Sequence, residues 1–207
     1  MKKLIIAISS IWLLAVSSAM SMELRPSIGI SGSTSVYAAT GTEENYNNAG
    51  SAVDTTTDEH GAFVADYGSI FVEAALNDMI SVGVDYVPMD FETPQNISQE
   101  DESNEKKTLA RFDDLTTVYA KLNLPLGGSY LKVGFSQVDV TPKTNGGSGN
   151  TYKSTSTEGF TVGLGYNHEI TGGVAVRLEV TGTEFDDVKS DNQQTNKTEI
   201  TVKDIIG

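Results

Sequence analysis

Polar and apolar residues alternate along most of this sequence, and this period of two constrains the fold more than any other feature. In the run from Phe160 to Asn167, every even-numbered residue is apolar and every odd-numbered residue is Thr, Gly or Asn. Successive side chains of a β-strand point to opposite faces, so the run predicts a strand with one apolar and one polar face. We expect about eight such strands, within residues 24–37, 63–76, 80–86, 118–124, 131–136, 160–167, 174–181 and 198–206.

The connections between these strands alternate between short and long. The short ones are Asn77-Asp78, Gly127-Gly128 and Thr171 to Gly173, whose residue types suit tight hairpin turns. An up-and-down antiparallel sheet would collect all the short turns at one end and all the long loops at the other. That asymmetry is typical of outer-membrane barrels. The long connections are expected at residues 40–61, 93–111, 141–158 and 189–197.

The first 21 residues have the layout of a secretory signal peptide. Lys2 and Lys3 precede an apolar run from Leu4 to Val16, and small residues follow. We predict cleavage after Ser21, with cleavage after Ala19 as the alternative. The apolar run is too short for a transmembrane helix, which needs about 20 residues. The sequence thus divides into a signal peptide, residues 1–21, and a β-barrel domain, residues 22–207.

Composition excludes several classes of function. The net charge of −14 argues against nucleic acid as a partner, because a polyanion is bound through Lys and Arg. With no Cys, the chain has no disulfide, thiolate metal site or Cys nucleophile. Only His60 and His168 could supply imidazole, and the strand pattern puts them at opposite ends of the barrel.

The charges on the polar strand faces are few and nearly balanced, whereas the surplus acids lie in the long connections. A face exposed to water in so acidic a chain would carry mostly negative charge. A narrow lumen instead requires each ion to find a partner, and it has room for the many Gly, Ser and Thr residues. We therefore predict either a lumen network of ion pairs or, as the alternative, scattered charges without mutual contact. The residues concerned are Arg25, Glu73, Asp85, Lys121, Lys132, Arg177 and Glu179.

The apolar faces are aliphatic in the middle, with Tyr and Phe toward the strand ends. This arrangement suits a lipid-facing belt with aromatic girdles at the two interfaces. A soluble barrel that lines a ligand cavity with its apolar face is the alternative. The residues expected to face lipid are Tyr86, Phe135, Phe160, Val162, Leu164, Tyr166, Val176 and Leu178.

The strand texture, as in Gly159 to Tyr166, resembles the small eight-stranded outer-membrane barrels of the OmpA, OmpX and opacity-protein type from Gram-negative bacteria. The resemblance covers residues 22–207 and rests on layout, since no single motif is diagnostic. It implies folding by the outer-membrane assembly machinery and roles in adhesion, surface shielding or membrane integrity. Family members usually end on a C-terminal aromatic residue, whereas this sequence reads Asp204-Ile205-Ile206-Gly207. We expect a last strand that lacks roughly half its length, with an unusual barrel as the alternative.

We identify no catalytic, cofactor-binding or metal-binding residues. Acidic pairs in the long connections, such as Asp113-Asp114, could bridge divalent cations to lipopolysaccharide, but they lack the spacing of a calcium loop. His60, next to Asp58 and Glu59, leaves a hydrolase as a minor alternative.

The sequence thus predicts an all-β, up-and-down antiparallel transmembrane barrel in the outer membrane, with a structural or surface-interaction role. The alternatives are a narrow diffusion channel and a secreted ligand-binding barrel. The expected partners are outer-membrane lipid, lipopolysaccharide, the assembly machinery and surface ligands of the host or environment that bind the loops. A closed barrel has no free edge that demands a partner, so we expect a monomer.

Overall fold

The computed structural model describes residues 25–46, 52–94, 96–101, 104–145, 152–171, 174–192 and 198–207. The predicted signal peptide and its cleavage site lie outside these ranges. The strands are β1 (Arg25–Tyr46), β2 (Val53–Ala75), β3 (Ile80–Tyr86), β4 (Phe91–Glu92), β5 (Asn96–Asp101), β6 (Asn104–Asn123), β7 (Ser129–Asn145), β8 (Thr155–Thr171), β9 (Val174–Phe185), β10 (Val188–Asp191) and β11 (Thr198–Ile206).

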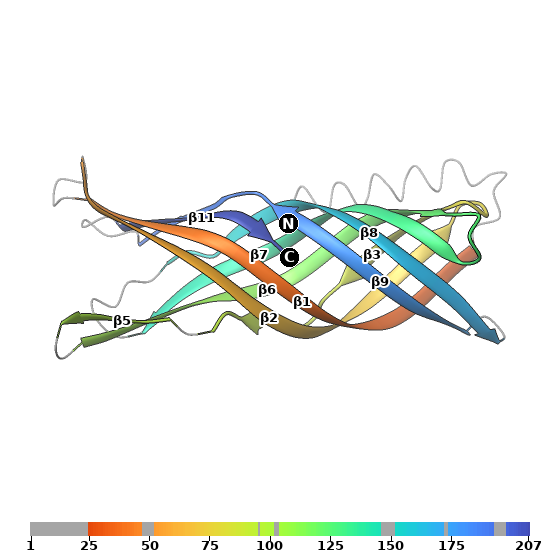
Figure 1. The fold of residues 1–207 in the computed structure, drawn as a ribbon, viewed down its shortest axis with the longest axis horizontal. Coiled ribbons are helices and arrows are strands. Elements are labelled where there is room, and N and C mark those ends of the chain that lie inside the picture. The colour runs from red at the N-terminus through yellow and green to blue at the C-terminus, as the bar shows by residue number, and fades with distance from the viewer. Residues whose placement is uncertain are drawn as a thin grey trace.

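Eight of these strands form an antiparallel ring, in the order β1-β2-β3-β6-β7-β8-β9-β11, and β11 pairs with β1 to complete it. Each predicted strand matches one member of the ring to within one residue at its ends, so the all-β, up-and-down barrel is confirmed. The long strands wind around a common axis, as Figure 1 shows with that axis horizontal. The short strands β4 and β5 pair with β6, and β10 pairs with β11. The described residues contain no helix long and apolar enough to cross a membrane.

Two of the three predicted tight turns lie within the described residues and form as their residue types predict, whereas the third, at residues 171–173, includes residues outside the described ranges. Gly127 and Gly128 both have positive φ, of 54° and 97°, which side chains with a Cβ rarely adopt. In the turn between β2 and β3, the Asn77 side-chain oxygen accepts hydrogen bonds from the backbone N–H groups of Met79 and Ile80, at 2.8 Å each. The barrel wall also contacts this turn, because the Asn123 side-chain amide on β6 donates a hydrogen bond to the Asp78 carbonyl oxygen at 2.9 Å.

The predicted long connections are much shorter than the sequence indicated. The β1–β2 ladder continues through Thr40–His60 to Tyr46–Val53, and the ladder between β6 and β7 extends to Lys107–Asn145. These strand ends are mostly polar or small on both faces, so they carry no regular alternation from which a strand could be predicted. Backbone pairing with the neighbour and a content of Thr that favours strands hold them extended.

The ladders that strand β11 forms with its two neighbours, β1 and β9, differ in length. Its ladder with β1 covers Ala38 to Asn45, and its ladder with β9 covers Glu184 and Phe185. Two further backbone hydrogen bonds join Gly207 to Thr183. Gly207 lies about midway along the barrel (Figure 1). The expectation of an incomplete last strand concerns the chain beyond these residues and stays a prediction.

Candidate functional site

The inward and outward faces of the barrel wall differ sharply in chemistry near the tight turns. On β7, the inward side chains of Lys132 and Ser136 are 5% and 2% exposed, whereas the outward Val133 and Phe135 are 48% and 64% exposed. The side chains predicted to face lipid are all exposed, by 39% to 69%, on the outside of the barrel: Tyr86, Phe135, Phe160, Val162, Leu164, Tyr166, Val176 and Leu178. The barrel wall is thus polar inside and apolar outside in this half.

Glu73, on the inward face of β2, is the centre of the larger ionic cluster. Its carboxylate accepts a hydrogen bond from the Lys121 ammonium group on β6 at 2.6 Å and from the Arg177 guanidinium group on β9 at 3.0 Å. The Tyr119 hydroxyl donates a third hydrogen bond at 3.0 Å. Residues from three strands therefore meet at one carboxylate. The ion pair between Glu73 and Arg177 joins β2 to β9 through the lumen.

Glu179, on the inward face of β9, is the centre of a second ionic contact. The Lys132 ammonium group lies 2.6 Å from its carboxylate, and the Tyr130 hydroxyl donates to the same carboxylate at 2.8 Å. Because Lys132 and Tyr130 are both on β7, this contact bridges the intervening strand β8 on the lumen side.

Aromatic rings fill the space between the two ionic contacts. The Lys121 ammonium group lies 4.6 Å from the centre of the Tyr130 ring, and that of Lys132 lies 4.3 Å from the Tyr119 ring. Tyr130 is fully buried, with 0% exposure. In these cation–π contacts the negative face of each ring attracts the cation, which partly replaces the water that the buried cation has lost.

Small residues on the neighbouring strands make room for the two tyrosines. A Cβ atom built on Gly165 would overlap the Tyr130 ring, and one on Gly83 would lie 2.6 Å from Cζ of Tyr119. Glycine is therefore needed at these inward positions for steric reasons. Strand alternation also places Tyr119 and Tyr130 on the polar face, but their part in the cluster was not predicted, because aromatic residues were assigned to the lipid-facing girdles.

The remaining two charges of the predicted lumen set behave differently. Asp85 lies on the inward face of β3, with the Ser69 hydroxyl as a hydrogen-bond neighbour and Lys132 near enough to interact with it electrostatically. Arg25 is outside the cluster, so its predicted place in the network was wrong. It sits at the end of β1, where its side chain is 58% exposed and pairs with Asp78 in the β2–β3 turn. Its strand parity is inward, but at the rim the long side chain reaches out to water.

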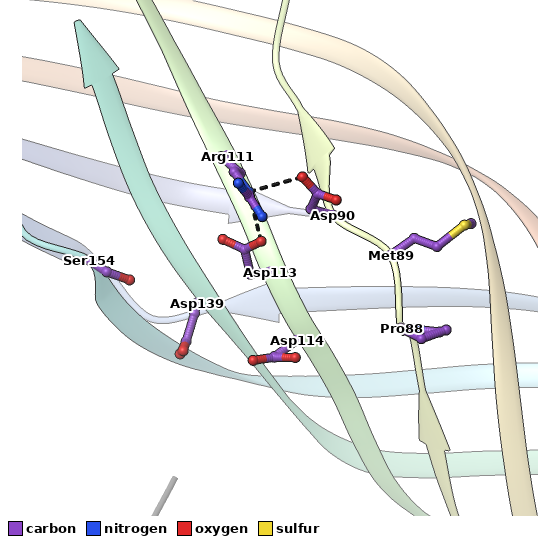
Figure 2. A pocket seen from close by; sticks show the side chains of 8 residues that line it. All are labelled: Pro88, Met89, Asp90, Arg111, Asp113, Asp114, Asp139 and Ser154. Carbon is purple, nitrogen blue, oxygen red and sulfur yellow. Dashed lines mark hydrogen bonds and ion pairs between the residues drawn. The ribbon is translucent and has the colours of Figure 1, made fainter.

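An acidic pocket of about 520 Å³ lies on the loop side of the barrel, beside the bulge in β6. Figure 2 shows Arg111 between two carboxylates, and its Nε lies 3.0 Å from Asp90 and 2.8 Å from Asp113. Asp114 and Asp139 also line the pocket. The described residues contain no group of three or more side chains arranged to hold a metal ion.

His60 and His168 are far apart on the chain and lie on different strands. The His60 ring Nδ1 lies 3.0 Å from the Thr40 hydroxyl, and the neighbouring Asp58 accepts a hydrogen bond from Thr42. The carboxylate beside His60 in sequence therefore binds a hydroxyl group on the neighbouring strand. This arrangement offers no support for a hydrolytic centre at His60.

A closed ring of hydrogen-bonded strands with an apolar outer face is the defining structure of integral outer-membrane β-barrels. The sequence pattern of the family described as "Outer membrane protein beta-barrel domain" matches residues 92–203. The chain belongs to this family, and it is an outer-membrane protein. The resemblance stated from the sequence is thereby confirmed at the level of family, fold and location.

A solved structure similar to this chain is that of Ail, the attachment invasion locus protein of Yersinia pestis, in complex with the heparin analogue sucrose octasulfate. The two are 10% identical, the match covers 84% of this chain and 96% of that chain, and the TM-score is 0.35. No curated protein sequence matches the chain.

Proposed function

We propose that this protein is a non-conducting outer-membrane barrel, a rigid scaffold that presents polar hairpins and loops at the cell surface. The observation that carries this proposal is the ionic cluster in the lumen. Two carboxylates hold three cations and two phenol groups across the barrel, and the side chains of Glu73 and Lys121 are only 7% and 5% exposed. An eight-stranded barrel has an interior just wide enough for side chains, so such a cluster leaves no continuous water path.

The scaffold role is supported by the length of the paired strands. Hairpin β1–β2 remains paired for 22 residues of β1, far longer than the roughly 9 to 11 residues that cross a bilayer. The polar ends of this hairpin are therefore held by backbone hydrogen bonds away from the lipid. Binding functions are commonly carried by segments that a rigid framework positions in this way.

The partners in this proposal are lipid around the apolar wall, lipopolysaccharide beside the strand ends, and surface ligands at the loops. The ligand chemistry is constrained by charge: the chain has 28 acidic and 14 basic residues. A partner that approaches the loop end electrostatically should therefore be cationic or neutral. We assign no catalytic role to the protein, and we expect it to act as a monomer.

Electrical recording in planar lipid bilayers tests the closed lumen. We expect the purified, folded protein to insert without a stable conductance step. A reproducible step that changes in Lys132→Ala but not in Val133→Ala would overturn the proposal in favour of a diffusion channel. Val133 is the matched control because it adjoins Lys132 on β7 and is exposed on the outer face.

Protease digestion of the protein in lipid vesicles tests the membrane placement separately. Cleavage should occur only at the loop end, and the strand segments that carry the apolar outer face should survive as protected fragments. Cleavage within residues 160–167 or 174–181 would contradict a lipid-embedded wall.

A further inference from the structure

The interior of the barrel changes character along its axis. On β7, the inward side chains are Tyr130 and Lys132 near the tight turns, then Ser136, and finally Val138 and Val140 toward the loops. The inner space thus contains an ionic layer, a hydroxyl layer and an apolar layer in succession. The lumen set predicted from sequence concerns only the first of these.

The hydroxyl layer is a chain of short hydrogen bonds between neighbouring strands. The Ser136 hydroxyl on β7 lies 2.7 Å from that of Thr117 on β6 and 2.7 Å from that of Thr161 on β8. The Thr161 hydroxyl lies 2.8 Å from that of Thr183 on β9. This layer separates the ionic cluster from the apolar layer above it.

The apolar layer is one continuous cluster of buried side chains built around stacked aromatic rings. The ring of Phe91 lies 5.1 Å from that of Phe112 and 5.3 Å from that of Tyr37, and Tyr37 lies 5.3 Å from Phe63. Tyr37, Phe91 and Phe112 are 5%, 9% and 8% exposed. The cluster consists of Tyr37, Ala65, Val87, Phe91, Phe112, Leu115, Val138, Val140, Phe185, Val188 and Ile205.

This apolar layer extends across the full section of the barrel. Its members come from β1, β2, β4, β6, β7, β9, β10 and β11, and from Val87 just after β3. The remaining wall strand, β8, contributes Gly159, where an added Cβ would lie 2.8 Å from the Phe185 ring. Phe185 therefore covers β8 directly, and every wall strand meets the layer.

On β8 and β9 the outer face changes in the opposite sense at the same level, whereas on β1 and β2 the outward Val36 and Val64 beside the layer are 62% and 63% exposed. On β8 the outward residue changes from Phe160 to the exposed Glu158, and on β9 from Val180, which is 79% exposed, to the exposed Glu184. Exposed apolar side chains in a row require lipid around them, whereas exposed carboxylates require water. On the side of β8 and β9 the edge of the bilayer therefore lies near Phe160, and the apolar layer beside these two strands lies beyond it.

We propose that the apolar layer is a second seal of the lumen, placed at the loop-side edge of the membrane. This inference rests on the proposed non-conducting barrel and extends it. An apolar constriction stops ions and water by dewetting, without any charge. The ionic layer within the membrane and the aromatic layer above it block the lumen by different physical means, so the loss of one leaves the lumen shut.

Two sets of substitutions separate the seals in planar-bilayer recordings. The ionic set removes two cation–anion pairs together, as Glu73→Ala, Lys121→Ala, Lys132→Ala and Glu179→Ala, so that the net charge of the lumen is unchanged. The aromatic set is Phe91→Ala with Phe112→Ala. Its matched control is Phe135→Ala with Phe160→Ala, which removes two aromatic rings on the outer face. The centres of these two rings lie 5.6 Å apart.

We expect the ionic set alone and the aromatic set alone to stay without conductance, and the two sets combined to give a stable conductance step. The ionic set combined with the outward control should remain closed. Conductance from the ionic set alone would overturn the second seal, and so would a closed combined variant. Conductance of the unaltered protein would instead overturn the proposed function, so the two failures are distinguishable.

Thiol labelling gives a readout that does not depend on the ionic set. The sequence has no Cys, so Ser136→Cys places a single thiol in the hydroxyl layer, below the proposed second seal. We compare two proteins: Ser136→Cys alone, and Ser136→Cys combined with Phe112→Leu, which disturbs the aromatic layer less than Ala would. A membrane-impermeant thiol reagent added on the loop side should react with the first at least about tenfold more slowly than with the second. Equal rates would overturn the proposal. Retention of the folded, heat-modifiable gel band shows that each variant has kept its barrel.

Discussion

At the scale of single residues, Glu73 is the side chain on which the ionic cluster depends most. Three side chains from two other strands donate to its carboxylate, and it is nearly buried. Burial of a charge is tolerated only where partners replace the lost hydration. Removing Glu73 therefore costs folding free energy in two ways: its own contacts are lost, and the cations Lys121 and Arg177 are left without their anionic partner.

Glu73→Ala should lower the free energy of unfolding by about 3 to 5 kcal/mol, the usual cost of leaving a buried charge without its partner. Urea unfolding in lipid vesicles, followed by the gel shift of the folded band, measures this change. The exposed outward Glu158→Ala is the control and should change stability by less than about 0.5 kcal/mol. Equal effects of the two substitutions would show that the ionic cluster does not stabilise the barrel.

Gly165→Ala should destabilise the barrel by about 1 to 3 kcal/mol, because the added methyl group overlaps the Tyr130 ring. The smaller Tyr130→Leu in the same chain should recover part of the loss. The same urea titration measures both variants. Gly182→Ala is a suitable control, since nothing lies within 4 Å of a Cβ there. A larger loss at Gly182 than at Gly165 would contradict this steric account.

Strand parity predicts much at this scale, but not contacts. It turns Glu73, Lys121 and Arg177 inward from three strands, because every second residue shares a face. It does not say that Glu73 takes both cations, since that choice depends on the height of each residue along the barrel. Arg25 shows the limit: its parity is inward, but at the rim water and Asp78 are within reach.

At the scale of elements, the middle of each strand is predictable and its ends are not. The apolar outer face creates alternation only where lipid contacts the wall. Toward the loops, β1 and β2 continue as a paired ladder through polar residues such as Thr42 and Asp58, and the sequence there reads as loop. The inward aromatic residues Phe91 and Phe112 were also not predicted, because they lie between the predicted strands, 80–86 and 118–124, and the connection expected at residues 93–111.

At the scale of the molecule, charge and chemistry are distributed along one axis. Ionic side chains fill the interior where the outer face is apolar, and apolar side chains fill it toward the loops, where the outer face becomes acidic on β8 and β9. The family, the barrel fold and the outer-membrane location all follow from the sequence pattern and are confirmed. The inner apolar layer could not be predicted, because it joins single residues from nearly every strand.

The surplus of acidic residues predicts how the loop end responds to polyanions. The folded protein should pass through a heparin column at physiological salt without retention, because its net charge of −14 repels a sulfated glycan. Retention that weakens as salt rises would contradict the proposed charge preference. A variant with Asp139→Lys, Glu158→Lys and Glu184→Lys should be retained more than the unaltered protein.

Cleavage of the leader is tested by sequencing the N-terminus of the protein isolated from outer membranes. The mature chain should begin at Met22, or at Met20 if cleavage follows Ala19. A chain that begins at Met1 would contradict the signal peptide.

The orientation of the barrel wall, apolar side out and polar side in, is tested most directly by fluorescence quenching from lipid. The sequence has a single Trp, Trp12, within the predicted signal peptide, so a chain that begins at Met22 has none. Single substitutions Phe160→Trp and Tyr166→Trp place the probe on the outer face, and Tyr130→Trp places it in the lumen. In vesicles with brominated acyl chains, the first two should be strongly quenched and the third should not. Strong quenching at position 130 with none at 160 and 166 would contradict the account.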